Sequence, residues 1–247
     1  MLTRPSEPPD AVLRYAAHDD GVVDVHLPAE RLRGRRPRPL VVNVHGGFWG
    51  QEYDRVHARP FAHGLVAEGF VVANLEYRRG PGSWSATSED LDTALAALPG
   101  LLAGIGVETT SVTLTGHSAG GHLVLWLASR QHPVDRVVAL APVGDLRAGA
   151  EHEWVRAATE EFLGGTRAEL PETYDAADPA TVLRHRPEAA VVVVHGDRDE
   201  DVPVGLSQRL AARFDWLDYR ELPGADHVSL IDPRSAWWTS VLAAVRG

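Results

Sequence analysis

The chain has 247 residues, 44% of them hydrophobic and 23% charged, which is the composition of an ordinary soluble globular protein with one large domain or two small ones. Its net charge of −10 argues against a nucleic-acid-binding surface, and the lack of cysteine excludes disulfides, thiolate metal sites and a cysteine nucleophile. All 24 basic residues are arginine, and we interpret the one basic cluster, at 31–39, as a solvated loop.

The chain carries no sequence signal for a membrane or for secretion. No apolar run approaches the roughly 18 residues that cross a bilayer, and the N-terminus lacks the apolar core of a secretory signal. We therefore expect a cytoplasmic protein that binds neither nucleic acid nor membrane. The oligomeric state does not follow from the sequence.

Short runs of β-branched and aliphatic residues recur along the chain, as expected for strands buried on both faces of a mostly parallel sheet. We predict strands at 22–27, 40–46, 70–77, 111–116, 136–142, 190–196 and 216–222. Helical patterns between them predict helices at 59–69, 88–103, 118–130, 205–214 and 233–245. This alternation predicts a single doubly wound α/β domain over residues 1–247, with the proline-rich segment 1–11 as a loose N-terminal arm.

One interval, residues 143–189, interrupts the alternation. It holds turn residues and short amphipathic pieces but no convincing strand. In a doubly wound fold such an insertion can lie over the carboxyl edge of the sheet, where ligands bind. We predict a small lid here, with an ordinary long connection as the alternative.

The segment TLTGHSAGGHL contains the pattern G-x-S-x-G at 116–120, with Ser118 at its centre. A strand pattern precedes it directly and a helix pattern follows, which is the context that a nucleophilic serine requires. The small residues at 116 and 120 allow neighbouring backbone segments to approach closely, so the hydroxyl of Ser118 projects from the turn. It lies at the N-terminus of the following helix, which favours negative charge. We predict that Ser118 is a nucleophile rather than part of an ordinary tight turn.

A serine nucleophile needs a base, and the base needs an orienting carboxylate. The segment VVVVHGDRDEDVP ends a predicted strand with Asp197, Asp199, Glu200 and Asp201, and ELPGADHVSL places His227 in the loop after the last predicted strand. The order serine, aspartate, histidine is the one described for α/β-hydrolases.

Over nearly its full length the chain resembles an α/β-hydrolase. In that family the acid commonly lies in a G-x-x-D-x-x-V-P pattern, which residues 196–203 match. The resemblance implies that Asp199 is the acid, with Asp197 as the alternative. It also implies that His227 is the base, rather than a histidine of a surface loop.

The strand pattern VVNV is followed by HGGFWG. If Ser118 attacks a carbonyl, the tetrahedral intermediate carries an oxyanion that needs N–H donors already aimed at it. One donor would come from Ala119, the residue after the nucleophile. By resemblance to the HGG-type esterases, the other donors are the amides of Gly47 and Phe48, and His45 is expected to brace their loop by hydrogen bonding.

The stretch HGGFW also matches the HGGxW form that is typical of kynurenine formamidases, which remove the formyl group from N-formylkynurenine. An aromatic wall beside the nucleophile suits a flat aryl substrate. Trp49 and Trp154 are the candidate wall residues. The alternative for Trp49 is that it packs under the loop, and for Trp154 that it belongs to the core. Tyr53, Arg78 and Trp84 are further candidates for the entrance.

The predicted mechanism is a two-step acyl transfer on a small-molecule ester or amide, without a cofactor. A zinc site on His45, His117 and His122 is the metal alternative, which we do not favour because each has another explanation. The predicted function is an arylformamidase-like hydrolase that deformylates N-formylkynurenine, with a broad-specificity carboxylesterase as the alternative. An oligopeptidase and an inactive binding module on the same fold are the remote alternatives.

Overall fold

The computed structural model describes residues 6–29 and 36–247. The predicted arm at 1–11 and basic loop at 31–39 therefore lie partly outside the described residues. Within these residues, we find no helix with both the length and the hydrophobicity of a membrane-spanning segment.

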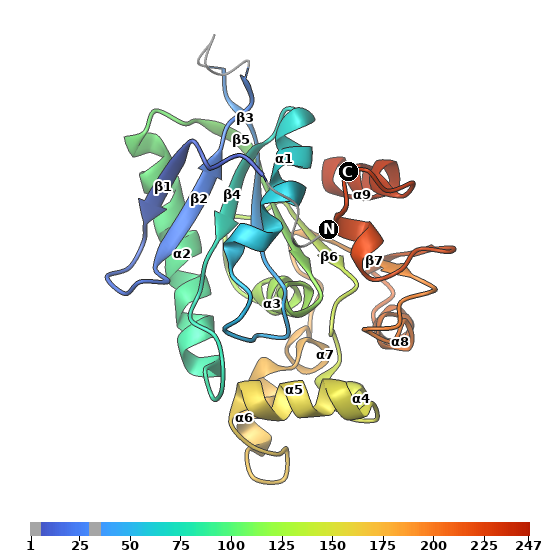
Figure 1. Cartoon of the computed structure of the whole chain (residues 1–247). Helices are drawn as coiled ribbons and strands as arrows, with labels where there is room; N and C mark the ends of the chain where they lie inside the picture. Colours follow the sequence, from blue (N-terminus) through green and yellow to red (C-terminus); the bar gives the residue numbers. More distant parts are fainter. Residues whose placement is uncertain (1–5, 30–35) are drawn as a thin grey trace.

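Strands of the described residues form one eight-stranded sheet (Figure 1). They are β1 (Ala11–Arg14), β2 (Val22–His26), β3 (Arg38–Val44), β4 (Val71–Leu75), β5 (Thr109–His117), β6 (Arg136–Leu140), β7 (Ala190–Gly196) and β8 (Asp218–Leu222). Their order is β1-β2-β4-β3-β5-β6-β7-β8, antiparallel at the two pairs that contain β2 and parallel elsewhere. The predicted fold class, a mostly parallel α/β sheet, is confirmed.

Helices connect the strands, as the alternation predicted. In the described residues they are η2 (Arg55–Ala58), α1 (Arg59–Ala67), α2 (Trp84–Gly104), α3 (Ala119–Leu127), α4 (Leu146–Gly149), α5 (Glu153–Leu163), α6 (Pro171–Ala177), α7 (Pro179–Val182), α8 (Gly205–Arg213), η3 (Val228–Ile231) and α9 (Trp238–Arg246). η2 and η3 are single turns of 3-10 helix.

The core lies on both faces of the sheet, because successive side chains of a strand point to opposite faces. Val42 and Val44 of β3 belong to the apolar cluster that also holds side chains of α2, α3 and α8. Val41 belongs to the other cluster, which holds side chains of α1 and α9. With both faces covered, the parallel strands bring their carboxyl ends to one edge of the sheet, and the loops after β3, β5 and β7 meet there.

β1 was not predicted, and it begins at the last residue of the predicted arm. The main chain of Asp10 donates to Val25 O at 2.9 Å, and β1 then pairs antiparallel with β2. The strand has four residues at the sheet edge, with half-buried and exposed positions in alternation. Such a short, partly exposed strand has little apolar signal.

The insertion at 143–189 holds α4, α5, α6 and α7, which lie together at one end of the molecule beyond α3 (Figure 1). Hydrogen bonds join the insertion to the rest of the fold. His122 Nε2 of α3 donates to Ala177 O at 2.9 Å, and Gly82 N, in the loop before α2, donates to Glu161 O at 2.8 Å. The insertion therefore packs on loops at the carboxyl edge of the sheet, and its movement as a lid stays a prediction.

Candidate active site

Ser118 stands directly between β5 and α3, with φ 57° and ψ −119°. A non-glycine residue held at positive φ carries strain of about 1–3 kcal/mol, which the surrounding packing must support. A Cβ on Gly116 would meet the main chain of Gly120, and a Cβ on Gly120 would meet Val44 O. The two glycines thus let β3, β5 and α3 approach closely enough to hold the serine in this turn.

The loop after β3 carries three consecutive residues at positive φ. They are Gly47 at 108°, Phe48 at 57° and Trp49 at 56°. In the described part of the chain, the N–H groups of Gly47, Phe48 and Ala119 donate to no other group. Ala119 N is in the first turn of α3, where the helix itself supplies no acceptor. The three predicted oxyanion donors are therefore all available to an anion.

His45 precedes this loop, and its ring is fully engaged. Nδ1 donates to Gly46 O at 2.8 Å, and Nε2 lies 2.9 Å from Glu76 Oε1. The ring also stacks on Tyr77 with centroids 4.5 Å apart, and Tyr77 Oη donates back to His45 O at 2.7 Å. His45 is 1% exposed, so it braces the loop and has no face open to a substrate.

Asp199, rather than Asp197, contacts the predicted base. His227 Nδ1 donates to Asp199 Oδ2 at 2.7 Å, whereas Asp197 Oδ1 accepts from Gly224 N at 2.6 Å. Asp199 Oδ1 accepts from Val202 N at 2.7 Å. Burial alone would raise the pKa of Asp199, but the hydrogen bonds from histidine side chains and from Val202 N outweigh it and hold the pKa well below its ordinary value.

Asp199 has a second histidine partner, His195, which sequence reasoning missed. His195 Nε2 lies 3.1 Å from Asp199 Oδ2 and 3.0 Å from Val202 O, so this nitrogen faces two acceptors and carries the proton. Nδ1 then accepts from Ser207 Oγ at 2.7 Å. His195 and Ser207 are completely buried. The signal in the sequence was the histidine of VVVVHG, at the carboxyl end of a strand.

His227 contacts His117, the residue that precedes Ser118. His117 Nε2 donates to His227 O at 2.8 Å, and the two rings are 4.3 Å apart. Burial, followed by the charge of His227, lowers the pKa of His117 well below its ordinary value, so His117 donates as a neutral ring. Because Nδ1 of His227 faces a carboxylate, Nε2 is the nitrogen left to accept a proton. In the described residues no hydrogen bond joins it to Ser118 Oγ, and such bonds often form only when substrate binds.

The aromatic residues of HGGFW divide into a buried one and an exposed one. Trp49 is 2% exposed and stacks on Phe162 of α5, with centroids 4.8 Å apart and planes at 4°. It packs under the loop, so we correct its prediction as a pocket wall. Phe48 is 41% exposed, and its ring contacts Trp154 of α5 edge to face at 5.5 Å. The consecutive positive φ angles turn the two neighbouring side chains to different sides of the loop.

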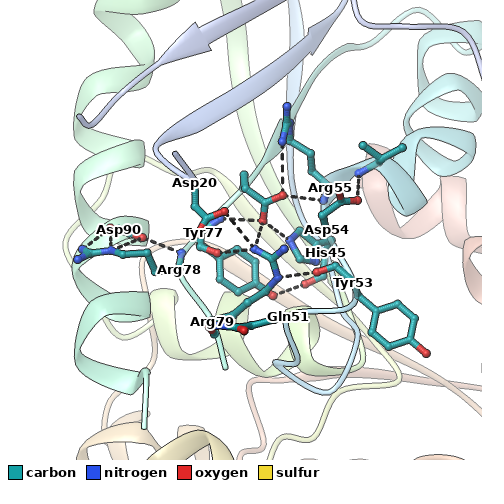
Figure 2. Close-up of polar contacts among 12 residues, drawn as sticks. Asp20, His45, Gln51, Tyr53, Asp54, Arg55, Tyr77, Arg78, Arg79 and Asp90 are labelled. Carbon is teal, nitrogen blue, oxygen red and sulfur yellow. Dashed lines mark hydrogen bonds and ion pairs between the residues drawn. The ribbon is translucent and has the colours of Figure 1, made fainter. Parts of the chain in front are cut away.

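The other predicted entrance residues are spread over the structure. Tyr53 lies beside Phe48, with ring centroids 6.2 Å apart. Trp84 is buried in the core. Arg78 is bound to α2, where Nη2 donates to Asp90 Oδ1 at 2.6 Å (Figure 2). The geometry therefore keeps Tyr53 near the loop and removes Trp84 and Arg78 from the entrance.

The histidines of the metal alternative have separate partners. His45 binds Glu76, His117 binds the main chain of His227, and His122 binds the main chain of Ala177. Within the described residues, the histidine and acidic groups close enough to share a cation are those of Asp199, Asp201 and His227. There Nδ1 of His227 is already committed to Asp199, so this cluster fits an acid–base pair better than a cation site.

Curated proteins that this chain is similar to include esterases. The esterase LipQ of Mycobacterium tuberculosis is 29% identical over 84% of this chain and 54% of its own length. The esterase LipC of the same organism is 26% identical over 78% of this chain and 53% of its own length. This chain thus spans about half the length of these two relatives. The kynurenine formamidase of Drosophila melanogaster is 34% identical over 44% of this chain and 38% of its own length.

Solved structures share the fold. Esterase B of Lactobacillus rhamnosis superposes with a TM-score of 0.78 at 21% identity, over 97% of this chain and 84% of that one. A putative thioesterase of Silicibacter gives a TM-score of 0.75 at 24% identity, over 96% of this chain and 84% of that one. The family model BD-FAE matches residues 23–214, which is well over half of the chain. The chain therefore belongs to the BD-FAE family, and its fold is that of the α/β-hydrolases.

Proposed function

We propose that the protein is a serine hydrolase that cleaves small esters through an acyl-enzyme. His227, oriented by Asp199, takes the proton of Ser118 as its Oγ attacks the carbonyl carbon. The amides of Gly47, Phe48 and Ala119 bind the oxyanion. The leaving alcohol takes the proton from His227, and water then repeats the sequence to release the acid and regenerate Ser118.

The observation that carries this proposal is the hydrogen bond of 2.7 Å from His227 to Asp199, formed beside a strained serine at a helix N-terminus. The unpaired amides around Ser118 support the same chemistry, because they can receive the negative charge that the attack creates. The esterase names of the relatives agree with it.

We propose further that the substrate carries a flat apolar group. Phe48 and Val228 are among the few exposed large hydrophobic side chains of the described residues, at 41% and 38%. Phe48 belongs to the oxyanion loop and Val228 follows His227 directly, so both belong to segments that carry groups of the proposed reaction. Trp154 contacts Phe48 from the insertion. Aromatic side chains at the edge of a site favour an aryl group by stacking or edge contact.

A formamide is the second candidate substrate, because its carbonyl would use the same groups. The HGGFW stretch and the similarity to a kynurenine formamidase over part of the chain favour it. The burial of Trp49 weakens this reading, since that side chain shapes the loop and lies away from its surface. A cytoplasmic location stays a prediction from the sequence.

A paired assay tests the proposal. Purified protein is given a short-chain nitrophenyl ester in one arm and N-formylkynurenine in the other, with Ser118→Ala as the control. We expect turnover of the ester that the control lacks. Much higher efficiency on the formamide would make the protein an arylformamidase, and absence of turnover in both arms would favour an inactive binding module.

A further inference from the structure

Glu76, the residue directly after β4, is a buried carboxylate with every oxygen engaged. It is 2% exposed. Oε1 accepts from Arg79 Nη1 at 2.6 Å and lies 2.9 Å from His45 Nε2. Oε2 accepts from Arg55 N at 3.0 Å. Nothing in the proposed chemistry uses this carboxylate directly.

The partners of Glu76 lie at the two ends of the oxyanion loop, residues 45–55. His45 is its first residue and binds Gly46 O with its other nitrogen. Arg55 begins η2, where the loop ends. The carboxylate of Glu76 therefore joins the first residue of the loop to its last.

Arg79 and the residue after it also form hydrogen bonds to the middle of the oxyanion loop. While Nη1 binds Glu76, Nε donates to Tyr53 O (Figure 2). Its own main-chain oxygen accepts from Gln51 Nε2 at 3.3 Å, and the next residue, Gly80, donates N–H to Trp49 O at 2.8 Å. The segment after β4 thus contacts the oxyanion loop at several points along its length.

The loop needs such a hold because its backbone is strained. Phe48 and Trp49 are both non-glycine residues at positive φ, and each carries strain of about 1–3 kcal/mol. A loop that relaxed this strain would turn the N–H groups of Gly47 and Phe48 away from the oxyanion. A shift of about 1 Å in such donors is enough to lower a rate substantially.

The negative charge of Glu76 balances the positive charge of the groups around it, so its loss would be costly. Arg55, Arg79 and the ring of His45 converge on it. Burial alone would raise the pKa of Glu76, but the hydrogen bond and charge of His45, with Arg55 N and Arg79, outweigh it and lower the pKa to about 2. Asp24, also fully buried, takes Arg55 Nε at 2.7 Å and so fixes that cation from the other side. Without the carboxylate, cationic groups would face one another in a poorly solvated place.

We propose that Glu76 is a positioning residue of the oxyanion hole, which holds the Gly47 and Phe48 amides through His45, Arg55 and Arg79. The proposal rests on the proposed function, because it assigns Glu76 a part in stabilising that reaction's oxyanion. If Glu76 served folding alone, replacing it would lower the amount of active enzyme. Stabilisation of the transition state in each folded molecule would not change.

The test compares Glu76→Gln with the wild type and with Glu89→Gln. Glu89 is a matched control because it also pairs with an arginine after β4, Arg78, but is exposed and outside the loop contacts. The readouts are kcat and KM on a nitrophenyl ester, and the ratio of rates for this ester and its thionoester. Sulfur accepts hydrogen bonds weakly, so an intact oxyanion hole prefers the oxygen ester strongly.

We expect Glu76→Gln to lower kcat by about 10- to 100-fold, approaching the loss seen when one oxyanion donor is removed, with little change in KM. The oxygen-to-sulfur ratio should shrink about as much, while Glu89→Gln keeps wild-type values. If Glu76→Gln does not fold, Glu76→Asp provides the same comparison, since it keeps the charge but is too short to join both ends of the loop.

An unchanged kcat and an unchanged oxygen-to-sulfur ratio in a folded Glu76 variant would overturn this proposal alone, even if thermal stability fell. A wild-type protein that turned over neither ester would overturn the proposed function, and this inference with it. The two failures are therefore distinguishable in one set of assays.

Discussion

Two buried carboxylate–histidine pairs belong to the proposed site, one at the oxyanion loop and one in the acid–base pair, and we expect them to have different roles. On the oxyanion side, Glu76 meets His45 at 2.9 Å. On the acid–base side, Asp199 meets His227 at 2.7 Å. In both pairs the carboxylate is almost completely buried, and neighbouring donors lower its pKa.

The histidines differ in what their second nitrogen faces. Nδ1 of His45 is bound to Gly46 O, so the ring has no site left for proton transfer. Nε2 of His227 makes no hydrogen bond within the described part of the chain, and its ring lies beside the residue preceding Ser118. A histidine–carboxylate pair in which both ring nitrogens are hydrogen-bonded can only support the structure. A pair in which one ring nitrogen stays free can also accept and donate a proton.

Replacing the proposed nucleophile gives the largest expected effect. Ser118→Ala should abolish ester turnover and leave the fold intact, because the serine hydroxyl makes no hydrogen bond to the scaffold in the described residues. Steady-state rates with circular dichroism check both parts, and full activity in this variant would refute the assignment.

The acid–base side should respond next. Asp199→Asn is expected to lower kcat by about 10⁴-fold, as loss of the orienting carboxylate does in serine hydrolases, and His227→Ala should be similarly damaging. Asp197→Asn is the matched control. It contacts Gly224 N in a turn and should cost less than about tenfold. A large loss of kcat in Asp197→Asn together with a small loss in Asp199→Asn would identify Asp197 as the acid instead.

Ser207→Ala sharpens the account of the acid's second histidine. It removes the donor that fixes Nδ1 of His195, and so loosens the hydrogen bond from His195 to Asp199. The loss of one hydrogen bond is worth about 0.5–1.5 kcal/mol, so kcat should fall about 2- to 10-fold. Ser229→Ala, which removes a surface bond to Asp226, is the control and should leave kcat unchanged. Equal rates for both variants would make His195 irrelevant to the acid.

A further buried carboxylate, Asp178, extends the comparison because, in the described part of the chain, its hydrogen bonds come from main-chain amides and a threonine and none comes from a histidine. Burial raises its pKa from 3.8 to about 6. Since the folded-state pKa is raised, this group's contribution to stability is full below pH 3.8 and is lost as the pH rises through about 6. Between pH 5 and 7 it should lower the free energy of unfolding by about 1 kcal/mol. Urea unfolding of the wild type and Asp178→Asn checks this, since the variant should lack that decrease. Identical pH dependence in both would contradict it.

The proposed triad residues could be predicted from the sequence because each lies in a short local pattern. Ser118 follows from a strand, a five-residue pattern and a helix, and Asp199 and His227 lie in short segments at strand ends. Glu76 and His195 escaped prediction because their roles depend on contacts made by the fold. Glu76 meets His45 across 31 residues, and only the pairing of β3 with β4 brings them together.

Sequence patterns also do not predict which of two adjacent side chains in a strained loop is exposed. Phe48 and Trp49 are adjacent aromatics, and the sequence offers no reason to prefer either as the exposed one. Strand periodicity does not apply where consecutive residues take positive φ, so their directions follow from the packing of Trp49 on Phe162. That partner comes from the insertion, whose position on the sheet the sequence indicated only in outline.

Identification of the reacting atom tests the central claim most directly. The protein is treated with a short-chain alkyl phosphonate ester, which reacts with an activated serine, and the adduct is located by mass spectrometry of its peptides. We predict one adduct, on Ser118, that is absent in Ser118→Ala and forms slowly in Asp199→Asn. An adduct on another residue, with ester turnover retained in Ser118→Ala, would contradict the account.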